Sequence, residues 1–329
     1  MVKKYLNLFN FTSLFIIANI QILSSCTNND TTVKKDNVPN KIVQKIEENP
    51  GNDIIAKTAK VNSKAIHKPE QLQLNENIQK ENNLKKLIVS DLKVVSKRSC
   101  SLKIYDEDGN KAIFKPYLKV NTTAKHEVAY YKIAHILDVK RVPVSVIGLL
   151  PLSKIKGFLS KKYPEFIDEF LKRVEFDSDN LIKGAFIEWI DNIEPLSKEK
   201  NDYISTIEIL KSNDTQLQQS AYRMIVLDYI LGNWDRFSGG NLFKIKDTNT
   251  LALIDQNNAF SSLSEGQEEK LNRYINLVKT VPPDLLSKIK LLNKSKIKDA
   301  VMIEENNTPL LSDAEIAQIM SRIELLQNR

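Results

Sequence analysis

The sequence predicts an α+β fold with two lobes, a small β-rich lobe followed by a larger, mainly helical one, with a disordered tether in front of them. Short strand-like runs fill residues 89–118 and are followed by a segment with apolar residues at helical spacing. The C-terminal part contains longer helical patterns and no internal repeat. Residues 86–329 are ample for one domain with a sizeable core. We expect an N-lobe at 86–183, a hinge at 184–192 and a C-lobe at 193–329.

The first 25 residues have the layout of an export signal. MVKK gives a basic start, a mostly apolar run follows, and LSSC ends on Cys26. This ending resembles the lipobox of bacterial lipoproteins. The resemblance implies cleavage before Cys26, attachment of palmitate or a similar acyl chain, and a lipid-anchored protein on the extracytoplasmic side of a membrane, at the periplasmic face or the cell surface. An uncleaved membrane helix is the alternative. Three asparagines and a glutamine disfavour it, because the run is already short for about 30 Å of hydrocarbon.

Residues 26–85 differ in composition from the rest of the chain. They are rich in Asn, Lys, Glu, Gln and Thr, and residues 27–85 contain no aromatic residue. Such a stretch buries too little apolar surface to offset its chain entropy. We therefore expect a disordered tether that separates the folded part from the lipid surface.

The N-lobe begins with three strand-like runs between residues 89 and 118. DEDGN (106–110) is the expected hairpin turn between the second and third runs, and Lys115 lies on the third. In residues 123–138 the apolar positions recur at helical spacing, which places Glu127 on a helix.

Other segments complete the two lobes. The remaining patterns predict strands at 142–150 and 181–190 and helices at 164–174, 215–233, 284–292 and 311–327. The strand LIKGAFIEWI would connect the lobes, although an ordinary core strand is equally compatible with its composition. The helix at 215–233 would be the buried centre of the C-lobe. The last helix opens with a capping box formed by Ser312 and Glu315.

Residues 227–260 combine a helix end, a polar turn and two short apolar strands, the second of which leads to Asp255. Three of the nine glycines of the chain fall in this turn. Asp235, Asn241 and Asp255 are the residue types that phosphoryl transfer requires, because one carboxylate orients the attacking hydroxyl and oxygen ligands hold magnesium. A plain surface turn is also rich in Asp, Asn and Gly, so this interpretation depends on the rest of the chain.

A second charged pair lies upstream. A strand lysine that contacts phosphates, held by a helix glutamate, is a recurring element of kinase chemistry. Lys115 and Glu127 have the required order and spacing. The alternative is two solvated charges in a chain of which 27% is charged.

Taken together, Lys115, Glu127, the LIKGAFIEWI strand, the GNWDRFSGGN turn and Asp255 occur in the order of the atypical kinases. The chain resembles the four-jointed and secretory-pathway kinases, the phosphatidylinositol 4-kinase type II-like enzymes and the HipA-type protein kinases. The resemblance spans about residues 89–260 as short motifs. It implies a bilobal protein-kinase-like fold and an exported kinase that transfers the γ-phosphoryl group of ATP, with Mg²⁺ or Mn²⁺, to a hydroxyl of a protein, glycan or lipid.

The same resemblance assigns roles to residues. Asp235 matches the catalytic aspartate, Asn241 and Asp255 match the metal ligands, and Lys115, with Glu127, matches the nucleotide-binding lysine. No glycine-rich loop joins the first two strands, so Ser99 and its neighbours in SKRSCS would cover the phosphates. In the hinge, backbone groups around Glu188 and Trp189 would meet the adenine ring.

Two features depart from the motif of these kinases. Many relatives carry His two residues after the catalytic aspartate, where this chain has Phe237. The spacing between aspartate and asparagine is typically five in the relatives, and it is six between Asp235 and Asn241. The resemblance therefore leaves two alternatives open, a catalytically inactive kinase-like binding lipoprotein and a structural lipoprotein without such a site.

Composition excludes several other classes. If Cys26 carries lipid, Cys100 has no partner for a disulfide, because the chain has only two cysteines. The three histidines lack the spacing of a zinc site or of a serine-hydrolase triad. Removal of the signal lowers the formal charge from +7 to +5, a basic excess that favours anionic partners such as nucleotides or lipid headgroups. The sequence contains no nucleic-acid-binding motif, so we expect no nucleic-acid partner.

Overall fold

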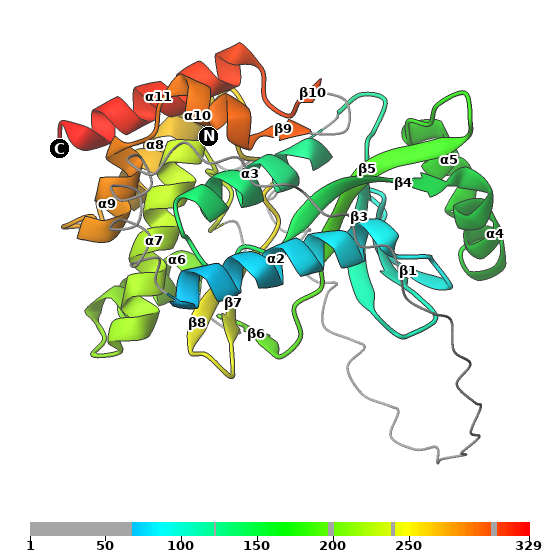
Figure 1. The fold of residues 1–329 in the computed structure, drawn as a ribbon, viewed down its shortest axis with the longest axis horizontal. Helices are drawn as coiled ribbons and strands as arrows, with labels where there is room; N and C mark the ends of the chain where they lie inside the picture. The colour runs from blue at the N-terminus through cyan, green and yellow to red at the C-terminus, as the bar shows by residue number, and fades with distance from the viewer. Residues whose placement is uncertain (1–67, 122, 197–200, 238–240, 304–307) are drawn as a thin grey trace, which may run out of the picture. The chain divides into compact units, whose positions relative to one another are not determined.

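The computed structural model describes residues 68–121, 123–196, 201–237, 241–303 and 308–329, which belong to one compact unit, Ala65–Arg329. The predicted signal peptide, Cys26 and most of the predicted tether lie outside the described residues. The described part is α+β, with the larger sheet formed by the N-terminal half and most helices in the C-terminal half (Figure 1), as the sequence predicts.

The larger sheet consists of five antiparallel strands in the order β1-β2-β3-β5-β4. They are β1 Asp91–Ser96, β2 Ser101–Tyr105, β3 Lys111–Pro116, β4 Ser145–Pro151 and β5 Leu181–Glu188. The predicted hairpin turn joins β2 to β3. There the Asp106 carboxylate accepts hydrogen bonds from the backbone and side-chain N–H groups of Asn110, at 2.8 and 2.7 Å. Gly109 adopts φ of 80° in this turn, a conformation that glycine reaches at little cost.

Side chains alternate between the two faces of this sheet, and each face packs against different helices. One face carries Phe114 and Phe186, whose ring centroids are 5.0 Å apart. It shares an apolar cluster with Leu159 of α4 (Leu152–Lys162) and Phe170 of α5 (Ile167–Arg173). α5 lies within the helix predicted at 164–174, whereas the sequence analysis did not predict α4.

The opposite face of the sheet packs against α3 (Ala124–Ile136), the helix predicted at 123–138. Ile113 and Ile187 on this face join the same apolar cluster as Val128 of α3. Lys115 lies two residues after Ile113 on β3 and therefore points to the same face. The sheet thus presents Lys115 to the helix that carries Glu127.

α2 (Lys68–Lys86) corrects the predicted end of the tether at residue 85, because the folded part already begins with this helix. α2 lies alongside α3 (Figure 1), where Glu81 accepts a hydrogen bond from the Tyr131 hydroxyl at 2.8 Å. Its Lys80 forms an ion pair with Glu188 of β5 at 2.8 Å. Leu84 is buried in the cluster of the sheet. These contacts hold α2 against the rest of the fold, although its sequence is so polar that it shows no apolar face.

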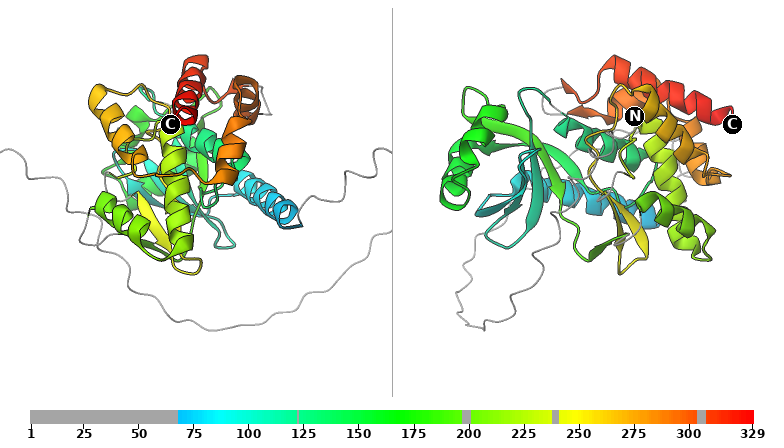
Figure 2. Two further views of the ribbon diagram at one scale, coloured as in Figure 1. Left: turned by 90° about the vertical axis from the view of Figure 1, so that its left-hand side faces the viewer. Right: turned by 180° about the vertical axis from the view of Figure 1, so that it is seen from behind.

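The C-terminal half surrounds α7 (Thr215–Leu231), the helix predicted to be its buried centre. Around α7 lie α6 Asp202–Lys211, α8 Glu265–Ile275, α9 Pro283–Lys290, α10 Lys294–Ala300, α11 Asp313–Gln327 and a sheet of β6 Ile193–Pro195, β7 Leu242–Ile245 and β8 Thr250–Leu253 (Figure 2). A two-stranded ribbon of β9 Met302–Ile303 and β10 Thr308–Pro309 precedes α11. The capping box of Ser312 and Glu315 opens α11, as predicted.

The predicted hinge, 184–192, is divided by the structure. Its first part belongs to β5, which pairs with β4 up to Ile187 and with β3 up to its end at Glu188. Residues 189–192 then lead to β6 and the C-terminal half. Among the helices described for this chain, none is both long enough and apolar enough to cross a bilayer.

Candidate active site

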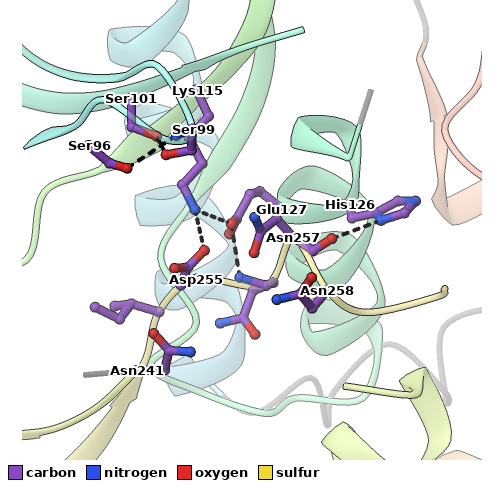
Figure 3. Close-up of polar contacts among 12 residues, drawn as sticks. Ser96, Ser99, Ser101, Lys115, His126, Glu127, Asn241, Asp255, Asn257 and Asn258 are labelled. Atoms are coloured by element: carbon purple, nitrogen blue, oxygen red, sulfur yellow. Dashed lines mark hydrogen bonds and ion pairs between the residues drawn. The ribbon is translucent and has the colours of Figure 1, made fainter. Parts of the chain in front are cut away.

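Lys115 connects three separate segments of the chain. Its Nζ lies 2.6 Å from Oε1 of Glu127 on α3 and 2.6 Å from Oδ1 of Asp255, which follows β8 (Figure 3). The side chains of Lys115 and Glu127 are only 14% and 3% exposed. Burial alone lowers the pKa of the Lys115 ammonium, but the Glu127 and Asp255 carboxylates outweigh burial and hold that pKa above its usual range. The pair predicted from the sequence is therefore present, and Asp255 is its third member.

Asp255 occupies a strained position between β8 and the following turn. Its φ is 59°, in the left-handed region that Asp and Asn tolerate better than most side chains. Its side chain is 42% exposed, so the carboxylate contacts Lys115 and still reaches open space. The backbone N–H of the next residue, Gln256, donates to Oε1 of Glu127 at 2.9 Å. Glu127 thus fixes both the lysine and the backbone that orients Asp255.

Asp235 lies in the turn that follows α7, surrounded by amide side chains. Its Oδ2 accepts a hydrogen bond from Nδ2 of Asn258 at 2.8 Å and a longer one from Nδ2 of Asn241 at 3.4 Å. Nδ2 of Asn241 also lies 3.3 Å from the Asp235 carbonyl oxygen. In the view of Figure 3, Asp255 is drawn between Asn241 and Asn258. The structure therefore brings all the sequence-predicted catalytic and metal-binding residues into one region.

The donor set fits a hard divalent cation. Asn241 directs its amide nitrogen toward Asp235, which leaves its amide oxygen available, and Asp255 has a second carboxylate oxygen beyond the one that meets Lys115. In the part of the chain that the structure describes, no group of three or more His, Cys, Asp and Glu side chains makes a closed metal site. A site for Mg²⁺ or Mn²⁺ needs only a few protein ligands when substrate phosphates complete the coordination of the metal.

Ser99 lies in the turn between β1 and β2. Its hydroxyl is 2.7 Å from the Ser101 hydroxyl, and its N–H donates to the Ser96 hydroxyl at 3.2 Å. In the β2–β3 register Leu102 pairs with Phe114, so Ser101 lies opposite Lys115 one position further along. The serine-rich turn thus lies at the Lys115 end of the sheet (Figure 3), and its contact with phosphates stays a prediction.

Glu188 and Trp189, predicted near the adenine ring, lie apart from the Lys115 cluster. Glu188 pairs with Ala112, so its side chain points to the face opposite Lys115, where it meets Lys80. Its backbone N–H already donates to the Val144 carbonyl at 2.8 Å. The Trp189 ring lies beneath Nζ of Lys103, 3.3 Å from the ring centroid. Only the carbonyl of Glu188 and the backbone after it remain for a nucleotide base.

The sequence analysis missed Asn258 and Gln256, although both lie in the DQNNAF segment that it used for Asp255. Asparagine and glutamine in a turn carry no distinctive spacing, so nothing in the pattern distinguished them from ordinary turn residues. Phe237, the residue at which the sequence departs from the atypical-kinase motif, is buried. Its ring packs edge-on against Tyr274 at 4.4 Å and Tyr203 at 5.7 Å between centroids. Phe237 is thus part of the apolar core of the C-terminal half.

No protein-family profile matches the chain, and no curated protein sequence matches it either. Solved structures do match. The crystal structure of the Golgi casein kinase with Mn/ADP bound aligns with a TM-score of 0.54 at 12% identity, covering 77% of this chain and 75% of that chain. A second crystal structure of the Golgi casein kinase gives 0.56 at 12% identity, with coverage of 77% and 74%.

The structure of hydra Fam20 with sugar aligns with a TM-score of 0.56 at 13% identity, covering 77% of this chain and 87% of that chain. Identities this low establish the fold alone. The chain therefore has an atypical-kinase-like fold, as its sequence motifs predict.

Proposed function

We propose that this protein is an atypical kinase that uses ATP and a divalent metal to transfer the γ-phosphoryl group to a hydroxyl of a protein, glycan or lipid. One observation carries the proposal. A buried lysine on a strand contacts both a helix glutamate and the aspartate of a separate turn, at 2.6 Å each. Kinases use a strand lysine held by a helix glutamate, with a metal-binding aspartate close by, because catalysis of phosphoryl transfer is mainly positioning and electrostatic stabilisation. The Mn/ADP-bound Golgi casein kinase, which shares the fold, supports the same use of nucleotide and metal.

Each residue would act through its own charge or hydrogen bonds. Lys115 would bind phosphate oxygens while Glu127 restricts its rotamers. Asp255 and Asn241 would hold Mg²⁺ or Mn²⁺, which when bound offsets charge on the phosphates. Asp235 would orient the acceptor hydroxyl and accept its proton late in the transfer, while Asn258 keeps the Asp235 carboxylate in one orientation.

The test compares the full chain with two variants, Asp255→Ala and Asp108→Ala. Asp108 lies at the exposed tip of the β2–β3 turn and serves as the matched control. We expect ATP with Mg²⁺ or Mn²⁺ to raise the melting temperature and to give autophosphorylation in the unmodified protein and in Asp108→Ala. Asp255→Ala should lose both effects, because the metal loses its carboxylate ligand. Equal responses of all three proteins would refute the proposed site.

The second candidate is a kinase-like lipoprotein that binds nucleotide without turnover. The buried Phe237 favours it, because an aromatic core residue takes the place of a histidine near the catalytic aspartate. In the same experiment this alternative predicts that ATP with metal raises the melting temperature of the unmodified protein and of Asp108→Ala. It predicts phosphoryl transfer in none of the three proteins.

The proposed location is the extracytoplasmic side of a membrane, through lipid on Cys26. The support is the apolar run that ends in LSSC. Cys26→Ser should remove the acylated thiol, so we expect unprocessed precursor and no labelling with a palmitate analogue. Cys100→Ser is the control, because Cys100 is buried and should leave labelling unchanged. Labelling that survives Cys26→Ser would contradict the anchor.

A further inference from the structure

Arg236, the residue after Asp235, is fully buried and uses every part of its guanidinium. Its side chain is 0% exposed. Nε and Nη2 donate to the two oxygens of Asp228 on α7, at 2.9 and 3.1 Å. Burial alone lowers the pKa of the Arg236 guanidinium, but the Asp228 carboxylate outweighs burial and raises that pKa above its usual range. The two charges thus form a bidentate pair inside the protein.

The remaining donors of Arg236 reach the two segments that carry the proposed metal ligands. Nη1 donates to the carbonyl oxygen of Asn241 at 3.1 Å and to that of Ile254, the residue before Asp255, at 2.7 Å. Nη2 also donates to Oε1 of Gln256, the residue after Asp255. One planar side chain therefore holds the backbone of Asn241 and both neighbours of Asp255.

The same network reaches the helix of Glu127. Oδ1 of Asp228 accepts a hydrogen bond from the Tyr130 hydroxyl at 2.6 Å, and Tyr130 lies one turn after Glu127 on α3. Nδ2 of Asn233 donates to Asp228 at 3.0 Å and to Gln256 at 3.1 Å. Burial and the neighbouring carboxylate raise the pKa of the Tyr130 phenol, so it remains a donor to Asp228.

We propose that Arg236 is a positioning residue that sets the distance and orientation between Asn241 and Asp255, and thereby the metal affinity of the site. The inference rests on the proposed function, because it concerns the metal that this site would hold. Arginine is required because five donors in a rigid fork reach a carboxylate, two carbonyls and an amide at once. A lysine keeps the positive charge beside Asp228 but directs its three donors from a single nitrogen.

The test measures how far Mn²⁺, titrated at one fixed concentration of ADP, raises the melting temperature of the full chain, and takes the Mn²⁺ concentration of half-maximal rise as the apparent affinity. Arg236→Lys is compared with the unmodified protein and with Arg223→Lys. Arg223 lies on the same helix, α7, and pairs at the surface with Asp284. We expect Arg236→Lys to bind Mn²⁺ about 10- to 100-fold more weakly, the range for residues that orient metal ligands. Binding of ADP without metal should stay unchanged in all three proteins, because Lys115 is untouched.

A second variant covers the case in which Arg236→Lys does not fold. The double substitution Asp228→Asn with Arg236→Gln removes both buried charges together, so that neither is left unpaired. It should fold and show the same loss of Mn²⁺ affinity.

The outcomes separate this inference from the proposed function. Failure of the unmodified protein to bind Mn²⁺ with ADP would refute the proposed metal site. If a folded Arg236→Lys or double variant binds Mn²⁺ as tightly as the unmodified protein, the positioning role of Arg236 is overturned and the proposed metal site is unaffected. Failure of both variants to fold would also overturn it, since Arg236 would then serve the fold as a whole.

Discussion

Asp235 accepts hydrogen bonds from two amide side chains through one carboxylate oxygen. Asn258 and Asn241 both donate to Oδ2, so Oδ1 is the oxygen that remains for an acceptor hydroxyl. The contact with Asn258, at 2.8 Å, is the shorter of the two and fixes the plane of the carboxylate. A general base must lie within hydrogen-bond reach of the proton that it accepts. The position of the Asp235 carboxylate is therefore the first criterion for its role, and its pKa is the second.

Asp235→Asn should separate catalysis from structure. The amide keeps the shape of the carboxylate but cannot accept a proton, so we expect turnover to fall at least about 100-fold. Nucleotide affinity and melting temperature should stay near those of the unmodified protein. Autophosphorylation or ATP turnover, measured beside melting curves, tests this directly.

Asp235→Ala, compared with Asp235→Asn, distinguishes a structural role of Asp235 from a catalytic one. If Asp235 serves only to cap its turn, the Asn variant should keep nearly full activity, and the Ala variant should lose roughly 0.5–2 kcal/mol of stability. Full activity of Asp235→Asn would remove Asp235 from the mechanism.

At this scale the sequence indicated most of the cluster, including the amide Asn241, but not the buried charged pair of Arg236 and Asp228. Lys115, Glu127, Asp235 and Asp255 were predictable because each has one dominant role and a fixed order along the chain. Asn258 was not, since an asparagine in a turn is common and its role depends on a contact 23 residues away in sequence. Long-range contacts of this kind follow from the packing of whole elements, which spacing alone does not encode.

At the scale of elements, β3 and α3 are joined by the ion pair of Lys115 and Glu127. The pair is buried, so removing one partner leaves an uncompensated charge beside the other. Lys115→Met and Glu127→Gln should each weaken ATP binding. The double variant should cost less than the sum of the two single losses, because residues in direct contact are coupled.

Nucleotide titrations of the four proteins in this double-mutant cycle measure the coupling. Lys103→Met and Glu81→Gln form the matched cycle, because Lys103 lies on β2 and Glu81 on α2, and no ion pair between them is described. Strict additivity for Lys115 and Glu127 would show that their contact does not contribute to nucleotide binding.

Elements differ in how far the sequence defines them. The β2–β3 hairpin, α3, α7 and α11 were predicted because each combines apolar periodicity with a turn or capping signal. α2 was assigned to the tether, since its order depends on a few contacts with α3 and β5 and not on a broad apolar face. The helices α4, α6, α8 and α10 were missed, although α5 and α9, which are no longer than α4, α6 and α8, were predicted. Helix length therefore does not account for the omission, and α8 even opens with a capping box of Ser264 and Gln267.

At the scale of the whole described unit, α11 is joined through Glu315 to α3, the helix that carries Glu127. Oε1 of Glu315 lies 3.0 Å from Nε2 of His126, the neighbour of Glu127. Nδ1 of His126 lies 3.3 Å from the carbonyl oxygen of Asn257, two residues after Asp255. The last helix of the chain thus contacts both α3 and the segment that carries Asp255, although the three are distant in sequence. This arrangement could not be predicted, because the capping box of α11 explains Glu315 locally.

Glu315 should make the stability of this unit depend on pH in the acid range. Burial raises the pKa of its carboxyl, but hydrogen bonds from His126 and Ser312 outweigh burial and lower that pKa to about 2, from an ordinary value of 4.5. A carboxyl whose folded-state pKa is depressed stabilises the fold fully above its unfolded pKa, and this contribution is lost as the pH falls to the folded value. The contribution of Glu315 should therefore disappear between about pH 4.5 and pH 2.

Glu315→Gln tests this contribution, because the amide still accepts a hydrogen bond from Ser312 but carries no charge. We expect the variant to melt at a lower temperature than the unmodified protein at pH 7, and the difference between them to shrink steadily as the pH falls from about 4.5 toward 2. Other carboxyls lose their charge in both proteins, so the difference isolates Glu315. Glu324→Gln, on an exposed position of α11, is the control and should follow the unmodified protein at every pH. A difference that stays constant from pH 7 to pH 2 would show that the charge of Glu315 does not stabilise the contact between α11 and α3.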